Sequence, residues 1–258
     1  MMQVFIQGIG LVMPGVESWQ QGQVILKSPE QFDLAAPLPP VAKSLLPANE
    51  RRRTTALIQM ALHAAEDAVK DVQQSMATVF ASSCGDLPIV DKIMQALTLP
   101  SRPVSPTHFH NSVHNAPSGY WSILAASTQA STSLSAWDES FSAGLVEAAT
   151  QVLVASKPAL LVAYDYPSPQ RFADKRQITA PFAVALVVAP SGKGAQLNLS
   201  VEQSGSDTSM KAASLETLRL ANPAARSLPL MQLLASSQQG EAYLPYTNNQ
   251  KLKVSVQP

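Results

Sequence analysis

The sequence of 258 residues contains as many lysine and arginine residues as aspartate and glutamate residues, 18 of each, so its net charge is zero. This balance argues against a nucleic-acid-binding protein, which normally carries a basic surface. A hydrophobic content of 46% is enough for one large domain with a core, and the low charged content of 14% favours association with a partner.

Three features of the sequence indicate the compartment. No apolar run reaches the ~20 residues that span a bilayer, so no membrane span is predicted. The first residues, Met1 to Gly8, lack a basic region and are typical of a strand rather than of a signal peptide. The single cysteine, Cys84, excludes an internal disulfide framework. We therefore expect a soluble, cytoplasmic protein.

The first third of the chain contains two strands and two helices by its patterns. Residues 3–7 alternate as in a short strand that Gly8 and Gly10 would close, and residues 11–38 are rich in loop signals. Residues 54–69 predict an amphipathic helix with Thr54 or Thr55 as its N-cap. A buried strand over residues 77–82 and a helix over residues 87–97 follow. Cys84 lies in the turn between them, and we interpret it as a buried, inert thiol.

Residues 101–115 contain three of the four histidines. His110 and His114 are four residues apart and would share one face of a helix. No cysteine or acidic residue falls at a metal-ligand spacing from them, so we predict no metal site. His63, within the first long helix, is interpreted as a packing or surface residue.

The stretch from Gln129 to Ala155 has the pattern of a short strand that is followed directly by a helix. Its first part is small and β-prone, and its second part has apolar residues at helical spacing, with Ser140 placed as an N-cap. Only a short connection around Trp137 and Asp138 separates the two. A strand that turns sharply into a buried helix is a common position for an enzyme nucleophile, because the helix N-terminus stabilises an anion.

The rest of the chain continues the alternation and then departs from it. Apolar strands are predicted over residues 159–163 and 181–188, with a charged loop over 164–179 between them. Strands and helices thus alternate from residue 3 to 189, which predicts a right-handed α/β layer with a mostly parallel sheet and helices on its faces. The tail from residue 191 to 258 predicts two strands and two short helices, an α+β extension.

Two runs, Asn111–Ile123 and Gln129–Ala155, resemble the β-ketoacyl synthase branch of the thiolase-like condensing enzymes. The resemblance implies one truncated ketosynthase-like domain over residues 1–258. Residues 1–190 would form a thiolase-like half, and residues 191–258 a divergent tail. In that family the strand-turn-helix carries the acyl-accepting cysteine, and here that position falls on Asp138, or on Glu139 with a shift of one residue.

The residues that the family uses for catalysis are not matched in this sequence. Family members carry two histidines and a glycine-rich loop in a second half, whereas all four histidines here lie at or before residue 114. A carboxylate at the cysteine position is a weak nucleophile, although it could bind a lysine or arginine. The resemblance therefore implies a non-catalytic, chain length factor-like subunit of the aryl polyene type that needs no cofactor.

Such a subunit pairs with a catalytically complete β-ketoacyl synthase in fatty-acid or polyketide-type biosynthesis, and an acyl carrier protein is a possible further partner. The family implies a contact through the strand before the nucleophile, with two aromatic residues of the preceding helix as anchors. The implied interface residues are Tyr120, Trp121, Ser131, Ser133, Ser135 and Trp137.

Two alternatives remain open at this point. The first is a stand-alone acyl thioesterase or acyltransferase that uses Ser142, because Ser142-Ala143-Gly144 gives half of a nucleophile elbow. The second is a divergent ketosynthase domain that serves as a scaffold for acyl carrier protein. In that case the arginines at 51–53 or the pair Lys175-Arg176 would contact the acidic carrier.

Overall fold

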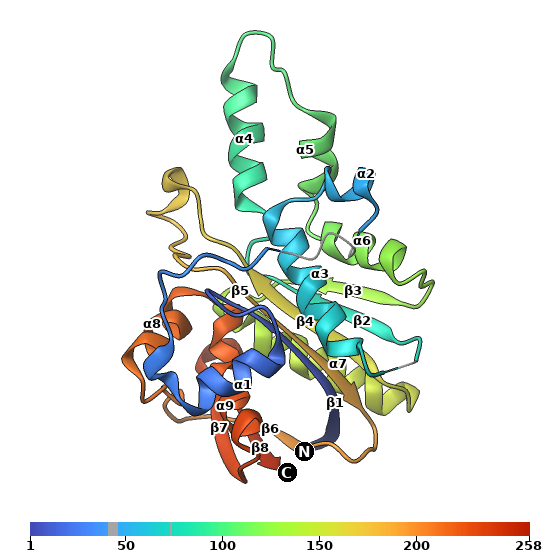
Figure 1. The fold of residues 1–258 in the computed structure, drawn as a ribbon, viewed down its shortest axis with the longest axis vertical. Coiled ribbons are helices and arrows are strands. Elements are labelled where there is room, and N and C mark those ends of the chain that lie inside the picture. The colour runs from blue at the N-terminus through green and yellow to red at the C-terminus, as the bar shows by residue number, and fades with distance from the viewer. Residues whose placement is uncertain (41–45, 73) are drawn as a thin grey trace.

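The computed structural model describes residues 1–40, 46–72 and 74–258 (Figure 1). In this part of the chain eight strands form one sheet in the order β3-β2-β4-β5-β1-β6-β8-β7. The strands are β1 (Met2–Val12), β2 (Ala77–Ala81), β3 (Ser131–Leu134), β4 (Ala159–Asp165), β5 (Phe182–Ala189), β6 (Gln196–Glu202), β7 (Gly240–Pro245) and β8 (Lys251–Gln257).

Nine α-helices accompany the sheet in the described residues. They are α1 (Trp19–Lys27), α2 (Ala48–Arg51), α3 (Ala56–Val69), α4 (Leu87–Thr98), α5 (Pro106–Asn111), α6 (Ala116–Leu124), α7 (Ser140–Ala155), α8 (Ala213–Ala221) and α9 (Leu228–Ser236). Short 3₁₀ turns at Trp137–Glu139 and Ala224–Ser227 precede α7 and α9. None of these helices is long and apolar enough to cross a membrane.

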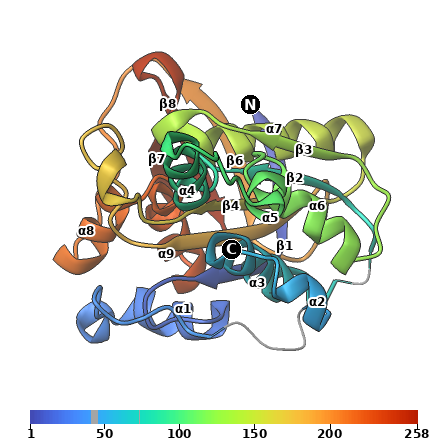
Figure 2. The ribbon, with the colours of Figure 1, turned by 90° about the horizontal axis from the view of Figure 1, so that it is seen from above.

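The sheet lies between helical layers. Figure 2 shows α7 and α3 on opposite sides of the strands. Alternate residues of β4 point to the two sides: Leu160, Val162 and Tyr164 join the core under α3, while Ala159, Leu161 and Ala163 join the core under α7. Because β4 is buried on both faces, its sequence is a continuous apolar run rather than an alternating one.

The predicted α/β layer is present, but its sheet is mixed rather than mostly parallel. Strand β2 pairs in parallel with β3 and β4, whereas all other pairings in the described residues are antiparallel. Parallel neighbours need a long crossover, usually a helix. The loop between β4 and β5 contains only one 3₁₀ turn, at Gln170–Phe172, so β5 returns antiparallel.

The prediction that Gly8 and Gly10 end the first strand is wrong, because β1 passes through both. A Cβ at Gly10 would lie 1.9 Å from the Ala64 carbonyl oxygen, and one at Gly8 would lie 2.0 Å from that of Ala68. These glycines therefore allow α3 to lie directly against β1. The region predicted to be irregular also contains α1, which the Ser18 side chain caps at Gln21 N–H.

Helix ends agree with the prediction in some places and differ in others. Thr55 is the N-cap of α3, accepting a hydrogen bond from Ile58 N–H. His110 belongs to α5 but His114 follows the end of that helix, so the two do not share a helix face. Ser140 is the first residue of α7 rather than its N-cap, and its hydroxyl bonds to the preceding turn instead.

The tail contains the predicted elements and extends the same sheet. Strand β6 pairs with β1 and β8, and β8 pairs with β7, while α9 packs beside α1. At the other end of the molecule, α4 and α5 form an arm that projects from the globule (Figure 1).

Candidate functional site: the turn between β3 and α7

Trp137 is the sharpest point of the turn from β3 to α7. Its φ of 52° lies in the left-handed region, which is costly for a bulky side chain and is typical of strained functional turns. The indole is 55% exposed, and the Arg176 guanidinium carbon lies 4.2 Å from its ring centroid. The chain thus has the strained strand-to-helix geometry of a nucleophile turn, with tryptophan at the strained position.

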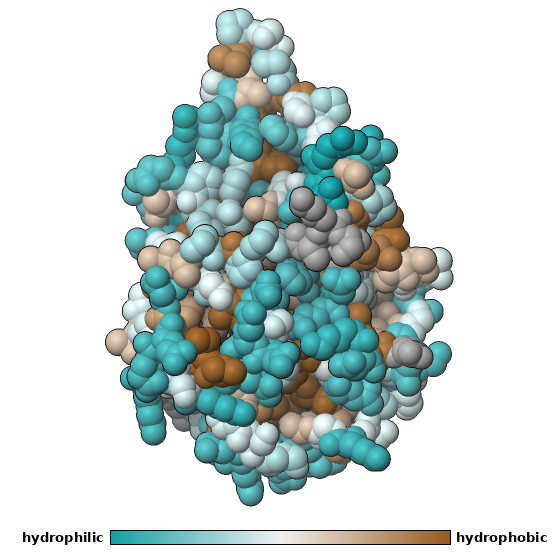
Figure 3. Space-filling model, viewed as in Figure 1, coloured by the Kyte–Doolittle hydropathy of each residue, from teal (hydrophilic) through white to brown (hydrophobic). Residues whose placement is uncertain are grey.

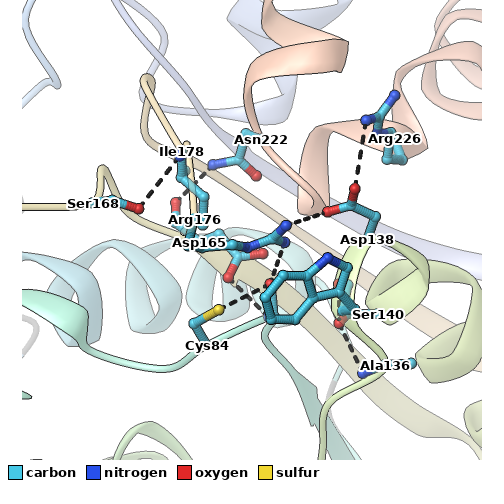
Figure 4. Close-up of polar contacts among 12 residues, drawn as sticks. Cys84, Ala136, Asp138, Ser140, Asp165, Ser168, Arg176, Ile178, Asn222 and Arg226 are labelled. Atoms are coloured by element: carbon cyan, nitrogen blue, oxygen red, sulfur yellow. Dashed lines mark hydrogen bonds and ion pairs between the residues drawn. The ribbon is translucent and has the colours of Figure 1, made fainter. Parts of the chain in front are cut away.

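Asp138, the next residue, is held by two arginines. Its Oδ1 lies 2.6 Å from Arg176 Nη1, and its Oδ2 lies 4.0 Å from Arg226 Nη2 (Figure 4). Arg176 comes from the loop between β4 and β5, and Arg226 comes from the 3₁₀ turn before α9. Burial lowers the pKa of Arg226, and the Asp138 carboxylate opposes this shift. The carboxylate therefore connects the turn to two distant segments of the chain.

Arg176 continues the network toward the end of β2. It donates a hydrogen bond to Ser83 Oγ, whose oxygen lies 3.3 Å from Cys84 Sγ. The buried Asp165 carboxylate accepts hydrogen bonds of 2.9 Å from both Ser82 Oγ and Ser83 N–H. Burial raises the pKa of Asp165 to about 7, although these hydrogen bonds and the charge of Arg176 act against the shift.

Of the other candidate residues, Cys84 and His114 contact the edge of this network and Glu139 does not. Glu139 follows Asp138 but forms no ion pair with the described residues. Cys84 is half-buried on the turn after β2, a different strand from the one that leads into α7. The His114 Nε2 atom lies 3.0 Å from the Ser82 carbonyl oxygen. The described residues contain no cluster of potential ligands that could hold a metal ion.

The six residues implied for the interface divide into exposed and buried ones. Ser131, Ser135 and Trp137 are exposed, and Ser133 is half-buried, at the edge of the sheet that β3 forms. Tyr120 and Trp121 are buried and pack into the core on the α3 side. Their rings thus lie beneath the surface near β3 rather than projecting from it.

The geometry does not favour the nucleophile proposed for a stand-alone enzyme. Ser142 lies inside α7 with 1% exposure, and its hydroxyl has no hydrogen-bond partner in the described part of the chain. Such a serine has neither access to substrate nor a base to activate it. The Asp138 carboxylate, bound to Arg176, is a poor nucleophile as well.

Arg226 and Asp165 were not predicted from the sequence to belong to a site. Arg176 was predicted only as a possible contact for an acyl carrier protein. The charges of the loop at residues 171–176 are visible in the sequence. The contact of Arg176 with Trp137 is a tertiary contact that no local pattern predicts. Asp165 ends an otherwise apolar strand, and this position was the one signal of a buried acidic residue.

Comparisons with known proteins agree with this architecture. A ketosynthase, ApeO, in complex with its chain length factor, ApeC, from Xenorhabdus doucetiae contains a similar chain, with a TM-score of 0.77 and 23% identity over 99% of this chain and 100% of that one. The ishigamide ketosynthase/chain length factor has a TM-score of 0.74 at 12% identity, covering 100% and 99%. A β-ketoacyl synthase from Burkholderia phymatum STM815 has a TM-score of 0.63 at 15% identity, covering 93% and 71%.

At these identities the structures establish a shared fold, the thiolase-like fold of ketosynthases. No curated protein matches the sequence. The family model for the beta-ketoacyl synthase N-terminal domain matches residues 19–248, which include both the turn and most of the tail. This chain therefore belongs to the beta-ketoacyl synthase N-terminal domain family.

Proposed function

We propose that the chain is a non-catalytic, chain length factor-type subunit that pairs with a complete β-ketoacyl synthase in the cytoplasm. The proposed pathway in which the pair acts is fatty-acid or polyketide-type biosynthesis of the aryl polyene kind. The observation that carries the proposal is the turn between β3 and α7. The strained position holds Trp137, and the next residue, Asp138, is bound to arginine, so no thiol is available there to accept an acyl group.

The sheet edge at β3 supports the proposed pairing. Strand β3 is the terminal strand of the sheet and pairs with β2 on one side. An exposed strand edge presents backbone groups that can pair with another chain. Ser118 Oγ lies 3.3 Å from Ser133 Oγ, and Gln151 donates a 3.1 Å hydrogen bond to Thr132 Oγ1, so neighbouring helices fix the side chains of this edge. Two side chains of this edge therefore already have hydrogen-bond partners within the chain.

An apolar groove continues the proposed surface beside the edge. It has a volume of about 690 Å³ between α5 and α6, and Phe109, Val113 and Ile123 contribute exposed apolar side chains to it. Figure 3 shows apolar patches on the side where α6 lies and near the end of the arm. Apolar surface of this kind marks interaction sites in soluble proteins. We propose that it faces the ketosynthase and contributes to the wall of its acyl channel.

Co-expression with a candidate ketosynthase that has the cysteine and both histidines tests the pairing. We expect a stable 1:1 complex on size-exclusion chromatography. Replacing Ile123 by glutamate should weaken it at least tenfold, since a charge would be placed in an apolar contact. The matched control is Leu220→Glu, because Leu220 is 53% exposed against 59% for Ile123 but lies on α8, across the molecule in Figures 1 and 2. A monomer that ignores every complete ketosynthase tested contradicts the proposal.

An acyl carrier protein is the proposed third component. Arg52 and Arg53 are exposed near the groove and remain candidates for contact with an acidic carrier. Arg176, by contrast, is engaged with Asp138 and Trp137 and is not presented to a carrier. Charge reversal at Arg52 and Arg53 should therefore weaken carrier binding in a salt-dependent manner, whereas reversal at the exposed Lys157 beyond α7 should not.

A further inference from the structure

We propose that Arg176 and Arg226 form an anion-binding site at the start of α7, and that Asp138 occupies this site as an internal ligand. The ligand class is a small carboxylate or a phosphate. All groups of this site belong to one chain, so the site does not depend on whether a ketosynthase is the partner.

The two guanidinium groups converge on one carboxylate from separate segments. Arg176 Nη1 contacts one oxygen of Asp138 at 2.6 Å, and Arg226 Nη2 approaches the other at 4.0 Å (Figure 4). Guanidinium groups bind carboxylates and phosphates through paired N–H donors, which is the arrangement that binding proteins use for these anions. Two arginines on opposite oxygens thus define a site for an anion, with Asp138 as its present occupant.

Both arginines retain hydrogen-bonding capacity that their contacts do not use. The Nε atoms of Arg176 and Arg226 are buried and have no hydrogen-bond partner among the described residues. The Arg176 side chain is only 10% exposed, so water does not readily satisfy this donor. A larger or differently placed anion could accept hydrogen bonds from these groups. The Asp138 carboxylate therefore does not use all the donors of the two arginines.

The start of α7 adds positive potential at the same place. This helix extends over 16 residues, and no side chain in the described chain caps its N-terminus. The first N–H groups of a helix carry a partial positive charge that favours a nearby anion. Two other carboxylates near Arg226 have cationic partners of their own: Glu216 pairs with Arg219 at 2.7 Å, and Asp207 pairs with Lys251 at 2.6 Å. Asp138 is thus the carboxylate in contact with both arginines.

The Asp138 carboxylate is accessible enough for an anion from solvent to take its place beside the arginines. Its side chain is 38% exposed, and its contact with Arg226 is long at 4.0 Å. Solvent ions can therefore reach the site once the carboxylate is removed or displaced. Truncation of Asp138 to alanine leaves two arginines at a space of carboxylate size beside a helix N-terminus.

Chemical rescue tests the site directly. The Asp138→Ala variant should melt at a lower temperature than the wild type, and acetate or inorganic phosphate should raise its Tm in a saturable manner at constant ionic strength. A rise of about 2–4 °C above a chloride control is expected at millimolar concentrations. The wild type should show no such saturable rise, because its own carboxylate occupies the arginines.

Two control variants separate a specific site from a general salt effect. Glu139→Ala changes the neighbouring carboxylate, which has no ion pair in the described chain, and should behave as the wild type. In Asp138→Ala combined with Arg176→Gln, the rescue by acetate and phosphate should disappear. Equal responses of Asp138→Ala and Glu139→Ala, or rescue that survives loss of Arg176, would overturn the proposal.

Asp138→Ser covers the case in which the alanine variant does not fold. Serine removes the charge and most of the side chain between the two arginines, so inorganic phosphate should bind there measurably by calorimetry. Saturable binding of phosphate or acetate that is absent from the wild type supports the site. Absence of binding of both anions to the variant refutes it.

Discussion

Replacement of Asp165 by asparagine should remove most of the pH dependence of stability between pH 4 and pH 8. Asp165 is fully buried, and its pKa is raised from 3.8 to about 7. A carboxyl group with a higher pKa in the folded state binds more protons there than in the unfolded chain. Its contribution to stability is therefore complete below about pH 4 and is lost as the pH rises through 7.

The magnitude follows from the size of the shift. A difference of about 3 pKa units at ~1.4 kcal/mol each corresponds to about 4 kcal/mol of stability lost between pH 4 and pH 8. Asparagine can still accept the hydrogen bonds from Ser82 Oγ and Ser83 N–H. Its amide would replace Asp165 Oδ2, which has no partner among the described residues, so an unsatisfied donor would cost about 1–3 kcal/mol at every pH.

Urea denaturation from pH 4 to pH 8.5 measures the effect. The Asp165→Asn variant should be less stable than the wild type at pH 4 and more stable at pH 8, with the two curves crossing in between. Asp174→Asn is the matched control, because Asp174 is exposed in the loop after β4 and should leave the wild-type profile unchanged. Parallel profiles for Asp165→Asn and the wild type would refute the reasoning, because they would show that the carboxyl group is not titrating in this range.

Three further predictions concern packing, strain and chemistry. Gly10→Ala should destabilise the fold by several kcal/mol in a urea titration, because its Cβ would overlap the Ala64 carbonyl oxygen. Gly119→Ala is the control and should not destabilise the fold, since a Cβ there meets no heavy atom of the described residues within 4 Å. In the same urea titration, Trp137→Gly should be more stable than Trp137→Ala by about 1 kcal/mol, because glycine adopts a φ of 52° without strain. A Trp137→Ala variant that is as stable as Trp137→Gly, or more stable, would contradict this explanation. Cys84→Ser should leave the condensation rate of the reconstituted complex unchanged, and a loss of rate would assign this thiol a chemical role.

Much of the fold was predictable because local patterns dominate it. The buried run of β4, the amphipathic face of α3 and the strand-to-helix turn before α7 are all visible in the sequence, and the structure contains them. Gly8 and Gly10 were misinterpreted because a glycine that ends a strand and a glycine that admits a helix look the same in one sequence. Only the position of α3 distinguishes the two.

The turn between β3 and α7 was predictable from the sequence, but the groups that contact it were not. Family resemblance identified Asp138 or Glu139, and the carboxylate's ability to hold an arginine was considered. The arginines themselves lie 38 and 88 residues further along the chain at 176 and 226, and no local pattern connects them with the turn. These ion pairs depend on the antiparallel direction of β5 and on where the tail packs against the sheet. The hydrophobic periodicity of the sequence determines neither.

The charges at the turn between β3 and α7 favour a carboxylate at Asp138. A helix start flanked by two arginines stabilises an anion, and a thiolate in such a field would be a stable, reactive group. A carboxylate supplies the same negative charge permanently and without comparable nucleophilicity. Asp138 therefore satisfies the electrostatics of the turn without supplying a strong nucleophile, which is the behaviour that the proposed non-catalytic role requires.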